Sequence, residues 1–187
     1  MQTETTSKTC PVEIAGGLDN SIRRFLQNPQ KLLKPFIHEG MTVLDIGCGP
    51  GFFSVEIAKL LGDSGKVIAA DLQEGMLEKV NKKIRGTKLE QRIELHKCMS
   101  NKIGVVEKVD FILAFYMIHE VQDPDKLFNE LKSILKPNGR IYIIEPKIHV
   151  SGKSFDEMTL KLEALGFTII ERPKVFFSRT VLLTITS

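Results

Sequence analysis

The sequence has few cysteines, no long apolar run and little net charge, and each shortage argues against a class of protein. Its three cysteines, Cys10, Cys48 and Cys98, form no C-x-x-C pair, so a zinc site, a disulfide framework and a three-cysteine cluster find no support. The longest apolar stretch, Phe111 to Ile118, is too short to span a bilayer. The formal charge of +3 does not call for a polyanionic partner. We therefore expect a cytoplasmic protein with no metal and no membrane partner.

The overall composition is that of one ordinary globular domain. The chain has 187 residues, of which 42% are hydrophobic and 26% charged. A chain of this length buries about 70% of the surface that it exposes when unfolded. It contains no internal repeat, low-complexity tract or linker that would mark a second domain. We expect one domain over residues 28–187, preceded by a polar arm over residues 1–27.

Apolar runs that predict buried strands alternate with amphipathic segments that predict helices. Asn28-Pro29 and Asp123-Pro124 are each expected to start a helix by the cap-plus-proline signal. Ser154 to Glu157 has the S-x-x-E form of a capping box and predicts the start of a third helix. Pro137-Asn138-Gly139 is expected to end the helix that begins at Asp123-Pro124. The strands are expected over residues 41–46, 66–70, 93–96, 109–115 and 140–145.

The pattern changes after Gly166. Residues 168–171 and 178–185 both predict strands, and the six residues between them cannot hold a crossover helix. This last pair is therefore expected to be antiparallel. The sequence predicts an α/β protein with a mostly parallel, Rossmann-like sheet, a C-terminal antiparallel hairpin and helices on both faces. Ligands of such sheets bind beyond the carboxyl ends of the strands.

Residues 43–53 read V-L-D-I-G-C-G-P-G-F-F, which indicates a loop that holds a ligand by its backbone. Gly47 and Gly49 fit the dinucleotide fingerprint, but the third glycine is Gly51, one position early. Asp45 would repel a pyrophosphate by roughly 1 kcal/mol at close range. A carboxylate here favours a cation instead, and S-adenosylmethionine is a nucleoside that carries an ammonium and a sulfonium but no phosphate. The loop therefore predicts this cofactor rather than a nicotinamide dinucleotide.

Asp71 supports the same interpretation. It ends the second predicted strand, 20 residues after Gly51, where an acid in such folds accepts hydrogen bonds from the ribose hydroxyls. An aspartate at the end of a strand often only caps the next helix. The two acids, Asp45 and Asp71, at these spacings around G-x-G-x-G favour the cofactor site.

From about Asn28 to its C-terminus, the sequence resembles the class I S-adenosylmethionine-dependent methyltransferases. The matching pieces are D-I-G-C-G-P-G, V-I-A-A-D-L, V-D-F-I-L-A-F-Y-M-I-H-E-V and L-K-P-N-G-R-I-Y-I-I-E-P. It is most similar to the small-molecule branch that includes the ubiquinone and menaquinone biosynthesis methyltransferases. The resemblance implies a seven-stranded sheet of order 3-2-1-4-5-7-6, S-adenosylmethionine as methyl donor and S-adenosylhomocysteine as product.

The resemblance also assigns cofactor contacts. It implies that the three glycines approach the methionine part of S-adenosylmethionine. Asp71 is expected to bind the ribose, and Leu72 is expected to pack on the adenine. Phe115 is expected along the methionyl tail. After the third strand this branch usually has an acid near the adenine amino group, and the chain has none there. The expected cofactor-binding residues are Asp45, Gly47, Cys48, Gly49, Gly51, Asp71, Leu72, Cys98, Met99, Ser100 and Phe115.

The chemistry of a sulfonium methyl group demands little of the protein, because the methyl is already activated. The protein must align the acceptor and exclude water, and an acceptor that bears a proton also needs a base. His119 is the first candidate for that base, although a histidine there can simply hold its loop. Tyr116 and His149 are further catalytic candidates. Glu120 and Glu145 could also project above the fourth and fifth strands.

Three functions remain open from the sequence. The first is methyl transfer to a small molecule. The second is methylation of RNA or protein. The N-P-P-Y or D-P-P-Y signature is missing after the fourth strand, which counts against methylation of nucleobases, so nucleic acid is not an expected partner. The third is a cofactor-binding domain without turnover, suggested by the missing acid. The arm over residues 1–27 is the expected lid, because no large insertion elsewhere could close over a substrate.

Overall fold

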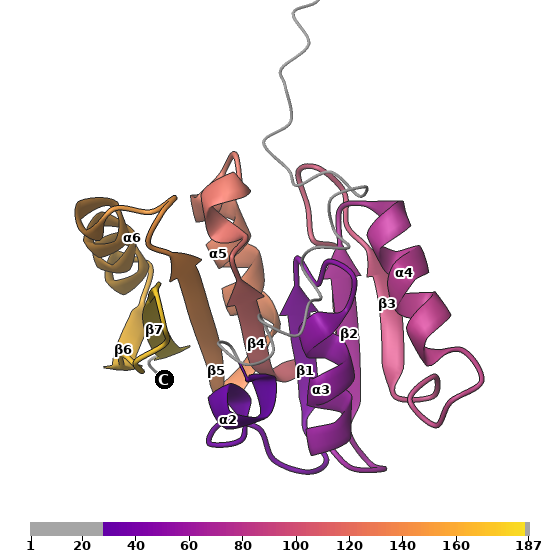
Figure 1. Cartoon of the computed structure of the whole chain (residues 1–187). Helices are drawn as coiled ribbons and strands as arrows, with labels where there is room; N and C mark the ends of the chain where they lie inside the picture. Colours follow the sequence, from indigo (N-terminus) through magenta and orange to yellow (C-terminus); the bar gives the residue numbers. More distant parts are fainter. Residues whose placement is uncertain (1–27, 186–187) are drawn as a thin grey trace, which may run out of the picture.

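The computed structural model describes residues 28–185, in which seven strands form one sheet of order β3-β2-β1-β4-β5-β7-β6 (Figure 1). The pairs among β3, β2, β1, β4 and β5 are parallel, and β7 is antiparallel to both β5 and β6. This confirms the predicted fold class and strand order. The strands are β1 (Thr42–Ile46), β2 (Lys66–Asp71), β3 (Ile93–Lys97), β4 (Val109–Phe115), β5 (Leu135–Pro146), β6 (Phe167–Glu171) and β7 (Ser178–Ile185).

Helices cover both faces of the sheet, as predicted. Neighbouring residues of β1 point to opposite faces, so Val43 packs in one core layer and Leu44 in the other. The first layer contains apolar residues of α2, α3 and α4, and the second contains those of α5 and α6. These helices are α2 (Pro29–Leu33), α3 (Phe52–Leu60), α4 (Glu74–Ile84), α5 (Pro124–Ile134) and α6 (Gly152–Ala164), with a short 3₁₀ helix η2 (Ile118–Glu120) after β4.

Two of the predicted helix starts are confirmed and one is wrong. The side chains of Asn28 and Asp123 accept hydrogen bonds from the first turns of α2 and α5. The S-x-x-E pattern at Ser154 does not start α6. Ser151 is the N-cap, and its Oγ accepts from the Ser154 backbone N–H at 3.1 Å. Phe155 of this helix is 2% exposed and packs in the core.

Two connections differ from the sequence expectation. Strand β5 begins at Leu135, so Pro137-Asn138-Gly139 lie within its irregular start instead of in a loop after the helix. The pairing with β4 shifts register there, and Asn138 has a φ of 62°. The link from β3 to β4 contains an isolated bridge between Met99 and Lys102 and no helix. Four of the five parallel strands, β1, β2, β4 and β5, are therefore followed by a helix.

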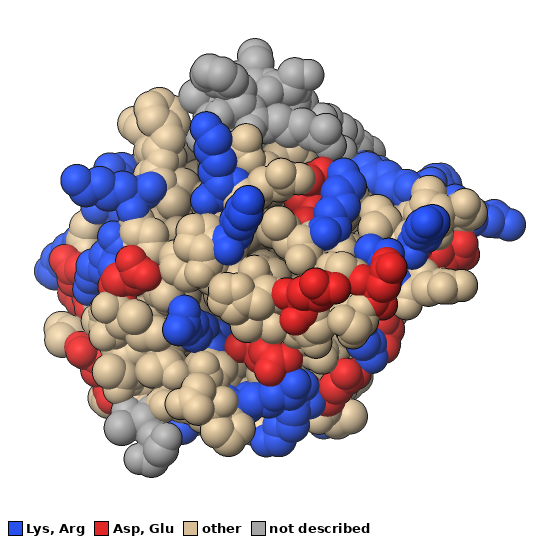
Figure 2. Space-filling view, turned by 90° about the horizontal axis from the view of Figure 1, so that it is seen from below, with Lys and Arg blue, Asp and Glu red and all other residues tan. Residues whose placement is uncertain are grey.

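Opposite charges alternate at the face seen from below in Figure 2, where blue and red side chains are interspersed. Among residues at the N-terminal ends of the strands, Lys66 pairs with Glu94 at 2.8 Å and with Glu107 at 2.5 Å. Lys136 pairs with Asp110 at 2.8 Å. This mixture does not form the continuous basic surface that nucleic acid binding favours. In residues 28–185, no helix has the length and apolar character needed to cross a membrane.

Candidate active site

The glycine loop is attached to the end of the neighbouring strand. The backbone N–H groups of Gly47 and Cys48 both donate to the Ala70 carbonyl oxygen, at 2.8 and 3.0 Å. Gly47, Gly49 and Gly51 have φ values of 67°, 53° and 79°. Only glycine adopts this left-handed region without a steric penalty. The spacing G-x-G-x-G therefore produces a tight, fixed turn between β1 and α3.

The three glycines do not serve the same purpose. A Cβ atom on Gly51 would lie 2.9 Å from Val80 Cγ2, and one on Gly47 would lie 2.9 Å from Met117 Cβ. A Cβ on Gly49 would meet nothing within 4 Å. Gly47 and Gly51 are thus required for close packing within the protein. Gly49 borders open space, which allows a ligand to approach its backbone.

This difference predicts opposite outcomes for two matched substitutions. Gly51→Ala is expected to lower the free energy of unfolding by about 2–4 kcal/mol, because strain at positive φ adds to the clash with Val80. Gly49→Ala should cost only about 1 kcal/mol, from φ alone, but should weaken cofactor binding. Urea denaturation and cofactor titration of both variants measure the two effects. Equal losses of stability would contradict the assignment.

Asp45 lies beneath this loop with 2% of its surface exposed. Its Oδ2 accepts a hydrogen bond from Ser54 Oγ of α3 at 2.5 Å. The carboxylate therefore fixes the start of α3 against β1. A buried negative charge also acts on the loop above it through the low-dielectric interior.

Asp71 connects β2 to the glycine loop. Its Oδ2 accepts from the Gly49 backbone N–H at 2.9 Å and its Oδ1 from the Gln73 N–H at 2.8 Å. Burial raises the pKa of this carboxyl, and hydrogen bonds from backbone N–H groups, chiefly those of Gln73 and Gly49, partly oppose the rise. A carboxylate has about four acceptor positions, so Asp71 retains capacity for a further donor. A ribose hydroxyl is a donor of the kind that this carboxylate can accept.

The residues expected around an adenine lie beside Asp71. The Cys98 backbone N–H donates to the Asp71 carbonyl oxygen at 2.9 Å. Leu72 and Met99 are large apolar side chains that are 40% and 58% exposed, and Ser100 is exposed as well. Exposed apolar side chains at the mouth of a site are suited to covering a flat base.

Neither described cysteine is suited to act as a nucleophile. Burial raises the pKa of Cys48 well above its usual value, and Asp45 and Asp71 raise it further. Burial likewise raises the pKa of Cys98 to about 11. Both thiols are therefore protonated near neutral pH and serve as small packing groups. Cys10 lies outside the described residues, as does the predicted lid.

The segment after β4 is strained at Tyr116, which has a φ of 57°. A bulky side chain in this region is an outlier that the surrounding structure must hold in place. The Tyr116 N–H donates to the Ile144 carbonyl oxygen, and its hydroxyl lies 2.6 Å from Ser178 Oγ. Its ring packs on Phe115, which is 6% exposed and also contacts Phe53. Phe115 therefore shapes the wall behind Tyr116.

Two of the three catalytic candidates, His119 and His149, lie next to each other. His119 Nδ1 lies 2.5 Å from Glu145 Oε2, and the rings of His119 and His149 stack at 5.3 Å. Glu145 is 1% exposed, and its Oε1 accepts from the Ile118 N–H at 2.9 Å. The bond from Glu145 raises the pKa of His119, against the opposing effect of burial. When His119 is neutral, this bond places the proton on Nδ1 and leaves Nε2 as a base.

The cofactor side and the catalytic side meet at Met117. Its side chain packs against Gly47, and it lies between Tyr116 and the 3₁₀ helix that carries His119. The structure thus brings the predicted residues to one edge of the sheet, at the carboxyl ends of β1, β2, β4 and β5. No local sequence pattern marks Ser54, Met117 and Ser178, so these residues of the site could not be predicted from the sequence. In residues 28–185, His, Cys, Asp and Glu form no group of three that could hold a metal ion.

The fold and site together define a class I methyltransferase, and comparison with known proteins agrees. A crystallised S-adenosylmethionine-dependent methyltransferase from Aquifex aeolicus is 34% identical, with a TM-score of 0.85 over 95% of this chain and 100% of its own. The family model described as a methyltransferase domain matches residues 37–170. The chain belongs to this methyltransferase domain family, which confirms the resemblance found in the sequence.

Curated relatives include quinone biosynthesis enzymes. A demethylmenaquinone methyltransferase of Lactobacillus johnsonii is 32% identical over 110 residues, 58% of this chain and 45% of the relative. The ubiquinone/menaquinone biosynthesis C-methyltransferase UbiE of Escherichia coli is 29% identical over 124 residues, 64% of this chain and 49% of the relative. The chain thus spans about half the length of the curated relatives that it matches.

Proposed function

We propose that this protein transfers a methyl group from S-adenosylmethionine to a small-molecule acceptor. One observation carries the proposal: Asp71 accepts a hydrogen bond from the backbone N–H of Gly49, where the glycine loop borders open space. This arrangement combines a backbone that a ligand can reach with a carboxylate that can accept ribose hydroxyls. The names of the quinone biosynthesis relatives support a small-molecule acceptor.

The residues present fit the cofactor. Asp71 would accept the ribose hydroxyls, Leu72 and Met99 would cover the adenine, and the loop around Gly49 would face the methionine part. The negative charge of Asp45 below the loop favours the cationic donor over a pyrophosphate. Cys48, Cys98, Ser100 and Phe115 complete the proposed walls of the site.

Bound S-adenosylmethionine supplies an electrophilic methyl group. The protein supplies position and a base. Glu145 holds His119 through Nδ1, so that the neutral ring can take a proton from an acceptor hydroxyl, amine or activated carbon through Nε2. Tyr116 is held by Ser178 and His149 by its stack on His119, and both restrict how an acceptor can lie. S-adenosylhomocysteine as product and a cytoplasmic location are part of the same proposal.

Ligand-dependent unfolding tests the cofactor. S-adenosylmethionine and S-adenosylhomocysteine are expected to raise the melting temperature in a concentration-dependent way, since a ligand that binds only the folded state stabilises it. NADH should have no such effect. Stabilisation by NADH alone would refute the proposal. A turnover screen with phenols, amines, thiols and quinone precursors then separates an enzyme from a binding domain: cofactor affinity without any product would favour the latter.

A further inference from the structure

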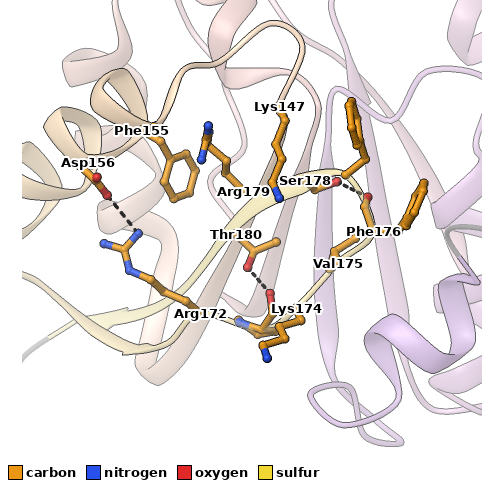
Figure 3. A pocket seen from close by; sticks show the side chains of 13 residues that line it. Lys147, Phe155, Asp156, Arg172, Lys174, Val175, Phe176, Ser178, Arg179 and Thr180 are labelled. Carbon is orange, nitrogen blue, oxygen red and sulfur yellow. Dashed lines mark hydrogen bonds and ion pairs between the residues drawn. The ribbon is translucent and has the colours of Figure 1, made fainter.

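A hollow of about 590 Å³ opens where the end of β5, the start of α6 and the β6–β7 connection meet (Figure 3). This volume suits a small organic ligand. Its charged lining consists of four cationic side chains and one carboxylate, which leaves a net charge of +3. Aromatic rings stand beside these charges. The cationic residues are Lys147, Arg172, Lys174 and Arg179, the acid is Asp156, and the rings are Phe155, Phe176 and Phe177.

The single acid is already matched within the protein. Arg172 Nη1 lies 3.5 Å from Asp156 Oδ1, and its Nη2 donates to Thr159 Oγ1 at 3.1 Å. The Arg172 guanidinium also lies over the Phe155 ring, 5.7 Å from its centre. Figure 3 shows this ion pair at one side of the hollow. The charge of Asp156 is therefore not available to offset the remaining cations.

The other three cations leave donors toward the hollow. Arg179 uses Nε to donate to the Val150 carbonyl oxygen at 2.9 Å, and both Nη atoms lie 3.5 Å from where a Cβ of Gly152 would be. The absence of a side chain on Gly152 keeps that end of the guanidinium accessible. Lys147 and Lys174 are exposed and form no ion pair with another residue of the range 28–185. An electropositive hollow of this kind attracts an anion.

The hollow adjoins the proposed catalytic residues. Ser178 lines it and also contacts the Tyr116 hydroxyl at 2.6 Å. Lys147 and Gly152, which also line it, flank the segment that carries His149, whose ring stacks on that of His119. A ligand in the hollow can therefore contact Ser178, which holds the Tyr116 hydroxyl.

We infer that the methyl acceptor is a small molecule that carries a carboxylate or a phosphate, and that this hollow binds the anionic group. Lys147, Lys174 and Arg179 hold the charge, while the exposed rings of Phe176 and Phe177 cover the apolar part of the acceptor. The inference rests on the proposed function and specifies its acceptor. A guanidinium can bind either anion through two parallel hydrogen bonds.

Three probes, benzoate, inorganic phosphate and hexauridylate, and one matched pair of variants test the inference in the full-length protein. Benzoate and inorganic phosphate are titrated into ¹⁵N-labelled protein, and backbone amide shifts are followed by NMR. We expect saturable shifts confined to residues 147–152 and 172–180. Lys147→Gln/Lys174→Gln should weaken the favoured anion about tenfold, the effect of two partly exposed charges. The control Lys153→Gln/Lys161→Gln removes the same charge from the outer face of α6 and should leave affinity unchanged.

Each outcome decides the point. Stronger binding of benzoate assigns a carboxylate, and stronger binding of phosphate assigns a phosphate. Absence of saturable shifts, or equal weakening in both double variants, overturns the inference. Binding of hexauridylate without binding of either small anion would overturn the small-molecule assignment in favour of RNA. Stabilisation of the fold by S-adenosylmethionine is measured on the same samples. If the wild-type protein shows no stabilisation, the proposed function is rejected. If it is stabilised but binds neither small anion, only this inference is rejected.

Discussion

Asp71→Asn is expected to weaken S-adenosylmethionine binding by about 10–100-fold while the fold survives. The amide can replace one carboxylate oxygen but presents N–H donors at the other, so it loses both a negative charge and an acceptor. The protein hardly needs the charge for stability, because burial of Asp71 already opposes ionisation. Isothermal titration calorimetry measures the affinity, and urea denaturation measures the fold.

Asp110→Asn is the matched control for this prediction. Asp110 also accepts a backbone hydrogen bond and pairs with Lys136, but it lies at the N-terminal end of β4, away from the site. Its substitution should leave cofactor affinity unchanged. Equal affinity in wild type and Asp71→Asn would contradict the ribose assignment. Because the pKa of Asp71 is raised, cofactor affinity should also begin to fall at a higher pH on acidification than an ordinary aspartate would predict.

His119→Ala is expected to lower kcat by about 10²–10⁴-fold with little change in cofactor affinity. The range is that of a positioned general base. The two effects should separate because His119 is held by Glu145 and His149, which are not among the proposed cofactor-binding residues. His38→Ala, at an exposed histidine far from the site, is the control. Parallel losses in turnover and cofactor affinity would reject the base role and leave His119 as a residue that holds its loop.

The pH profile of kcat distinguishes a catalytic role of His119 from a role in holding its loop. Glu145 raises the pKa of His119, so the neutral base, and with it kcat, should increase with pH through a value above 6.5. Glu145→Gln should shift this limb to lower pH, and NMR titration of the His119 ring should follow it. A pH profile of kcat that Glu145→Gln leaves unshifted would contradict the pair.

The pair of His119 and Glu145 also stabilises the fold, with a pH dependence opposite to that of kcat. Because the folded-state pKa of His119 lies above its unfolded value of about 6.5, its contribution to stability is fully present below that pH. The contribution is lost as pH rises through the folded-state pKa. Activity should therefore rise over the pH range in which this stabilisation declines.

The sequence by itself determined most of the elements and predicted the proposed cofactor half of the site. Runs of apolar residues predicted strands such as β1 and β7 to within one residue, because a continuous apolar run, typical of a strand covered on both faces, is a local feature. The glycine spacing and Asp71 were readable for the same reason: a strand, a tight turn and a helix are consecutive in the chain. The start of α6 was not readable from the sequence, because Ser154 has a Glu three residues later, as a capping box requires, whereas Ser151, the actual N-cap, does not.

Only the tertiary structure decided the catalytic half. His119 and Glu145 are 26 residues apart in the chain, and Tyr116 and Ser178 are 62 apart. Their pairing depends on the order of β4, β5 and β7 in the sheet, which no short pattern encodes. The same holds for the hollow, whose cations come from the segment after β5, the β6–β7 connection and β7. Side chains from separate strands meet only when hydrogen bonding places those strands side by side, so their joint charge cannot be read from any one stretch of residues.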